Sequence, residues 1–155
     1  MRDNAWLEKE LDYLLKKYFS NVKITNPIEI QFGREAKFRF GSIRLVSERS
    51  ARGIKNLKSL LDIKGTPKKS AIVVTSMFAD EQIPVDVVRY TISHELCHYA
   101  HGFSSYNKRL FKHPHHGGIV NKELKARGAE ELIDEFKKWL KDYRKKILAG
   151  RVRLY

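Results

Sequence analysis

The stretch from Ser93 to Gly102 reads S-H-E-L-C-H-Y-A-H-G and contains an H-E-x-x-H motif at residues 94–98. Residues four apart on an α-helix lie on one face, about 6 Å from each other, so His94 and His98 could bind one zinc ion. Glu95 would then reach the zinc-bound water and act as a general base. The stretch therefore predicts a helix that carries a hydrolytic zinc site.

The residues around the motif predict a helix over about 85–101 that belongs in the core. Val88, Ile92, Leu96 and Tyr99 fall on the side opposite the histidines. A helix so apolar makes buried histidines and a buried glutamate costly unless a partner satisfies them, and a zinc ion would do so. Gly102 is placed where such a helix would end.

A catalytic zinc takes three protein ligands and keeps one position open for water, so a third ligand must come from elsewhere. His101 lies about 10 Å along the helix axis from His94, too far to share its ion, and is expected to support the site from outside or to face solvent. The metzincin pattern would need Gly at position 101 and His at 104, where the chain has His101 and Ser104. Two candidates for the third ligand stay open: Glu123 and a histidine of the cluster at 113–116.

The hydrophobic pattern predicts a single α+β domain over residues 1–155, with a core over about 22–127. A small, mostly antiparallel sheet is expected to pack against the buried motif helix, between amphipathic helices at both termini. The expected elements are a helix at 5–19 capped by Asp3 or Asn4, a strand at 28–32, an antiparallel hairpin in which Gly41-Ser42 turns the chain from 38–40 into 43–46, a short helix within 54–61, a buried strand at 71–75, a helix at 119–127 and a basic helix at 129–148.

Charge and cysteine content point to an intracellular partner. The chain has 31 Lys and Arg residues against 18 Asp and Glu, a net charge of +13, and such an excess favours polyanions by counterion release. Residues 137–155 alone hold eight basic residues against Asp142. DNA is therefore the predicted partner, although late basic residues also suit the helix dipole. The single cysteine, Cys97, fits a cytoplasmic location and a packed side chain, and no apolar run is long enough to cross a membrane.

Several motifs together resemble a SprT-like (Spartan/SprT) zinc metalloprotease domain over about residues 28–127. They are the strand at 72–76, Pro84 followed by Val88, the run Ile92–His98, and His116-Gly117. The family includes DNA-dependent proteases that degrade proteins crosslinked to DNA. The resemblance implies a zinc cofactor bound by His94, His98 and His116, with Glu95 as general base. The chain departs from the family signature at Val120, where an aromatic residue is expected. His113 and His115 compete with His116 for the position of the third ligand.

The resulting hypothesis is a zinc-dependent metalloendopeptidase that acts on DNA-associated or DNA-crosslinked proteins, with Glu95 activating the zinc-bound water. Tyr106, His101 and the unused loop histidines are possible donors to the developing oxyanion. Two alternatives stay open. One is a small gluzincin-like peptidase without a nucleic-acid role, and the other is a DNA-binding module with a structural zinc.

Overall fold

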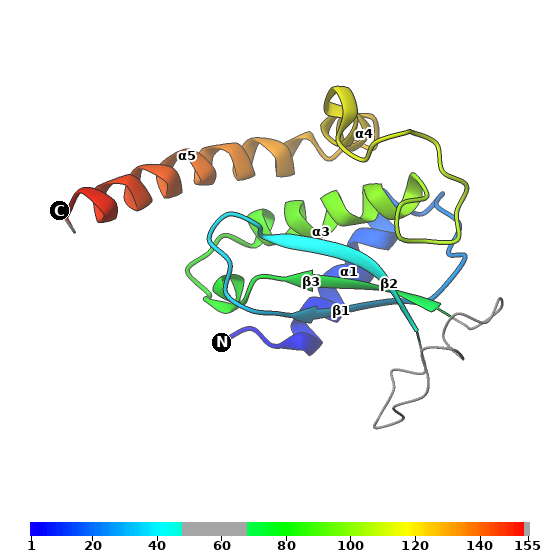
Figure 1. Ribbon diagram of the computed structural model, residues 1–155, viewed down its shortest axis with the longest axis horizontal. Helices are drawn as coiled ribbons and strands as arrows, with labels where there is room; N and C mark the ends of the chain where they lie inside the picture. The colour runs from blue at the N-terminus through cyan, green and yellow to red at the C-terminus, as the bar shows by residue number, and fades with distance from the viewer. Residues whose placement is uncertain (48–67, 154–155) are drawn as a thin grey trace.

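The computed structural model describes residues 1–47 and 68–153, and the strands in these ranges form one sheet (Figure 1). The strands β1 (Ile28–Phe32), β2 (Gly41–Ser47) and β3 (Lys68–Val74) lie in the order β1-β3-β2. β3 runs parallel to β1 and antiparallel to β2, and its Ile72 is flanked by Ile30 on one side and Ile43 on the other. The architecture is the predicted α+β class, with a sheet that is mixed rather than mostly antiparallel.

The antiparallel hairpin predicted with a turn at Gly41-Ser42 is wrong. β3 lies between β1 and β2, so these two strands do not pair with each other. Gly41 and Ser42 begin β2 instead of forming a turn, and residues 33–40 contain no strand. The run around Ile72 is the most apolar of the three segments, and it takes the central place because burial there removes most apolar surface from water. β3 is therefore the buried strand that the sequence predicted at 71–75, and it begins three residues earlier, at Lys68.

The N-terminal helix α1 (Asn4–Tyr18) packs against β1 and against the motif helix. Its N-cap is Asp3, whose side chain accepts a hydrogen bond of 2.8 Å from the backbone N–H of Trp6. Leu7, Leu11 and Leu14 are buried in the same core cluster as Ile30 and Ile72. Both the helix and the Asp3 cap agree with the sequence prediction.

The motif helix α3 (Val85–Ala100) follows the short 3-10 helix η1 (Ser76–Ala79) and lies along the sheet (Figure 1). Its C-terminus is closed by two hydrogen bonds, from the N–H of Gly102 to the carbonyl of Tyr99 (3.1 Å) and from Phe103 to His98 (2.8 Å). Gly102 has φ +83°, the left-handed conformation that this type of cap requires. The predicted helix and its glycine stop are confirmed.

The chain ends in the helices α4 (Ile119–Ala126) and α5 (Glu130–Arg153), and η2 (His116–Gly118) leads into α4. Both helices were predicted, with α5 running further than expected. Phe136, Trp139 and Tyr143 of α5 pack around Phe40, with ring centroids 5.4–6.0 Å from it. The helix predicted within 54–61 lies outside the described residues. Within the described part of the chain, no helix is long and apolar enough to span a membrane.

Candidate metal centre

Three imidazole rings converge at the C-terminal half of α3. His94 and His98 lie one helical turn apart, with ring centroids separated by 4.8 Å. His115 reaches them from the loop between α3 and η2, and its Nε2 atom lies 3.1 Å from the Nε2 atom of each. One ring nitrogen from each histidine lies within 4.8 Å of the other two. The fold thus brings together two residues of the motif and one residue from a loop about 17 positions further on.

The chemistry of this donor set fits a zinc ion. Zn–N distances of about 2.0–2.1 Å in a tetrahedron place ligand nitrogens about 3.4 Å apart, close to the separations of the His115 nitrogen from its two partners. A neutral imidazole has one N–H donor and one nitrogen lone pair, so the three converging Nε2 atoms cannot all hydrogen-bond to one another. A single cation can accept all three lone pairs. Three imidazoles with an open side are the donor set of a catalytic zinc.

The electrostatics of the cluster keep its helical histidines neutral. Burial, assisted by the neighbouring His115, lowers the pKa of His94 to about 4. Burial and then the charges of His94, His115 and His101 lower the pKa of His98 to about 3. Neutral imidazole is the form that binds a metal. Among the described residues, the buried Nδ1 atom of His98 has no hydrogen-bond partner.

The structure brings His115 into the cluster in place of the expected His116. His113 and His116 are exposed and lie outside the group of converging nitrogens. Consecutive residues in a loop point their side chains in different directions, so a site that His115 faces is not also faced by His116. The His-Gly pair of the sequence is His116-Gly117 and therefore favoured His116, whereas the path of the loop places His115 at the cluster.

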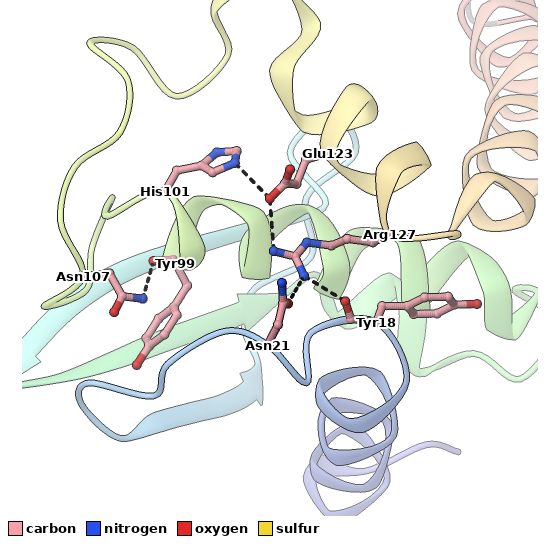
Figure 2. A network of polar contacts seen from close by, with 7 residues as sticks. All are labelled: Tyr18, Asn21, Tyr99, His101, Asn107, Glu123 and Arg127. Carbon is pink, nitrogen blue, oxygen red and sulfur yellow. Dashed lines mark hydrogen bonds and ion pairs between the residues drawn. The ribbon is translucent and has the colours of Figure 1, made fainter.

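Glu123 and His101 also lie outside the cluster, where they contact each other (Figure 2). The Nε2 atom of His101 is 3.5 Å from Oε1 of Glu123, which in turn lies 3.1 Å from Nη2 of Arg127. The expectation that His101 is not a ligand agrees with this geometry. His101 is 2% exposed, so it does not face solvent, and the carboxylate of Glu123 is engaged away from the three histidines.

Glu95 lies beside the histidines on α3 and is 6% exposed. Burial raises the pKa of its carboxyl group to about 7, against the opposing effect of the positive charge of Arg39. β2 passes close to this carboxylate at Gly41. A Cβ atom at that position would lie 2.8 Å from Cγ2 of Thr91 and 3.4 Å from Oε1 of Glu95. The glycine therefore allows the edge strand to approach the general-base candidate.

A cleft of about 670 Å³ opens over the three histidines and Glu95. Its walls are β2 with the segment before it and the loop after α3, and Phe136 of α5 also contributes. Two arginines that the sequence did not single out line the cleft: Arg39, and Arg109, whose guanidinium lies 4.7 Å from the ring centroid of Phe103. No local sequence signal distinguishes them from the chain's other cations. Tyr106 is instead bonded through its hydroxyl to the N–H of Lys68 and does not line the cleft.

Comparison with protein-family models, with curated proteins and with solved structures finds no match to this chain. The resemblance to a SprT-like domain therefore rests on the motif residues alone and stays a prediction.

Proposed function

We propose that this protein is a zinc-dependent metalloendopeptidase of SprT-like type, with His94, His98 and His115 as metal ligands and Glu95 as general base. The observation that carries the proposal is the convergence of three Nε2 atoms beside a buried glutamate in an open cleft. His115 takes the place that the resemblance gave to His116.

When bound, zinc would supply Lewis-acid polarisation of the scissile carbonyl and of the attacking water. Glu95 accepts a proton from that water as its oxygen bonds to the carbonyl carbon. The same carboxyl group then gives the proton to the amine nitrogen as the C–N bond breaks, so that the carboxylate is restored. Arg39 and Arg109 line the cleft and are the cations available to the developing oxyanion.

A purely structural zinc is the weaker alternative. Structural zinc sites are closed by four protein ligands, whereas the described residues supply three converging histidines that face a cleft. A structural site also has no use for a buried carboxylate next to its first ligand. The open side of the cluster and the position of Glu95 both favour catalysis.

We further propose that the substrates are proteins bound to DNA, because α5 carries a series of exposed cations and a segment beside it lines the cleft. The cations of α5 between residues 137 and 146 are all exposed: Lys137, Lys138, Lys141, Arg144, Lys145 and Lys146. The hydroxyl of Tyr143 donates a 2.9 Å hydrogen bond to the carbonyl of Lys37, which places the segment 37–39 beside this helix. Arg39 in that segment lines the cleft. DNA bound along this surface would bring an attached protein near Glu95.

The test is casein cleavage and zinc content in the wild-type protein and in Glu95→Gln, each with and without single-stranded DNA. We expect one zinc per chain in both proteins and a loss of cleavage of at least about 100-fold in the variant, because general-base catalysis contributes about that much. DNA should stimulate the wild-type protein. Unchanged cleavage by Glu95→Gln with zinc retained would rule out the assigned base, and the absence of DNA stimulation would contradict the DNA-linked role.

A further inference from the structure

We propose that Glu123 is a positioning residue that holds His115 in place for metal binding, through a network formed by His101, Glu123 and Arg127. The inference rests on the proposed metal site, and it gives Glu123 a role other than that of a ligand. Figure 2 shows the network, which joins the C-terminal end of α3, the helix α4 and the segment after α1.

His101 fixes the loop on the N-terminal side of His115. Its backbone carbonyl accepts a 2.9 Å hydrogen bond from the N–H of Leu110, and its ring packs edge-on against Phe111 at 4.8 Å between centroids. His101 is the C-cap of α3 and is 2% exposed, so it is a rigid anchor. The loop is therefore attached to the motif helix four to five residues before His115.

Glu123 fixes the chain on the C-terminal side of His115. It lies on α4, which begins four residues after His115, and its Oε1 atom contacts both His101 and Arg127. The same carboxylate thus links α4 to the anchor that holds the preceding loop. His115 therefore lies between two segments that are both attached to His101, the loop before it directly and α4 through Glu123.

Arg127 connects the carboxylate of Glu123 to the end of α1. Its Nη1 atom donates hydrogen bonds to the carbonyl of Tyr18 (2.9 Å) and to Oδ1 of Asn21 (2.6 Å). Its guanidinium also lies 4.7 Å from the ring centroid of Phe19, which is buried in the core. α4 is therefore held on two sides, by α3 through Glu123 and by α1 through Arg127.

This polar network is poorly explained by stability alone. Only His101 is buried, whereas the side chain of Glu123 is 29% exposed, and ion pairs that solvent reaches contribute little to stability. His115, by contrast, is an exposed loop residue that must hold its Nε2 atom 3.1 Å from two others. The network supplies the fixed geometry that this exposed side chain does not obtain from packing.

The experiment measures zinc affinity by chelator competition in Glu123→Ala and Glu123→Gln, at a temperature where circular dichroism shows each variant folded. Glu8→Ala is the matched control, because Glu8 is an exposed glutamate on α1. We expect a 10- to 100-fold loss of affinity in Glu123→Ala, a smaller loss in Glu123→Gln, which keeps a hydrogen-bonding oxygen, and no change in Glu8→Ala. Wild-type affinity in the folded Glu123 variants would overturn the proposal. The Gln variant decides if the Ala variant does not fold.

Hydrogen exchange over residues 103–118 in the metal-free proteins separates this inference from the proposed function. If the wild-type protein binds no zinc, the proposed function fails and exchange alone decides on Glu123. Faster exchange of this loop in the Glu123 variants, with α3 unchanged, supports the positioning role. Equal exchange in variant and wild type contradicts it.

Discussion

At the scale of single residues, the site depends on positions where only a hydrogen atom fits. A Cβ atom at Gly102 would lie 2.5 Å from the backbone carbonyl carbon and oxygen of Lys108, and the residue also has φ +83°. Gly102 both ends α3 and allows the loop that carries His115 to fold back against the helix. Gly128 has nearly the same backbone angle, φ +80°, with no atom within 4 Å of a Cβ. A side chain at Gly128 would meet backbone strain alone, whereas a side chain at Gly102 would meet the same strain and a steric clash.

We expect Gly102→Ala to destabilise the protein more than Gly128→Ala. The left-handed conformation alone should lower the free energy of unfolding by about 1 kcal/mol in Gly128→Ala. The contact with Lys108 should add about 1–3 kcal/mol in Gly102→Ala, as overpacking does elsewhere. Urea denaturation of both variants measures the difference. Equal losses would show that Lys108 moves away freely and that the close approach is unimportant.

At the scale of elements, α5 has two faces with separate roles. Phe136, Trp139 and Tyr143 form the packed face against Phe40, so these aromatic rings are not an exposed stacking surface for bases. The opposite face carries exposed lysines at 137, 141 and 145, spaced by one helical turn. If DNA binds here, the contacts are with its phosphates and depend strongly on salt.

Replacing Lys137, Lys141 and Lys145 together by Gln should lower the salt dependence of binding to single-stranded DNA. Each lost phosphate contact reduces the slope of log K against log[salt] by about 0.7, so we expect a change of about 2. Titrations by fluorescence anisotropy at several salt concentrations measure the slope. The control replaces Lys9, Lys16 and Lys23, which are exposed on or just after α1, by Gln. The same slope change in both triple variants would mean that binding follows net charge and not this helix.

The elements differ in how well the sequence predicted them. The period of apolar residues and the glycines at 102 and 128 were enough to place α3 and α4 with their ends, because these signals are local. Alternation in residues 28–46 indicated strands but not their partners. The alternation of apolar and polar residues predicts which face of the sheet each side chain lies on. The central position of β3 instead depends on competition for that position between segments far apart in the sequence.

At the scale of the whole molecule, part of the candidate site follows from local sequence and part follows only from the tertiary fold. His94, Glu95 and His98 could be predicted from the helical spacing of one motif. His115 could not be separated from His113 and His116, because the path of the loop depends on contacts that it makes with His101 and on the attachment of α4 by Glu123 and Arg127. Arg39 and Arg109 became apparent only when the cleft brought them near the histidines.

Zinc content of His115→Ala and His116→Ala, compared with wild type by mass spectrometry of the metal after dialysis, tests the central claim most directly. His116 is the matched control because it is an exposed histidine next along the chain. We expect one zinc per chain in the wild-type protein and in His116→Ala, and a strong loss of zinc in His115→Ala, since two imidazoles remain. Zinc retained in His115→Ala and lost in His116→Ala, with both variants folded, would contradict the account.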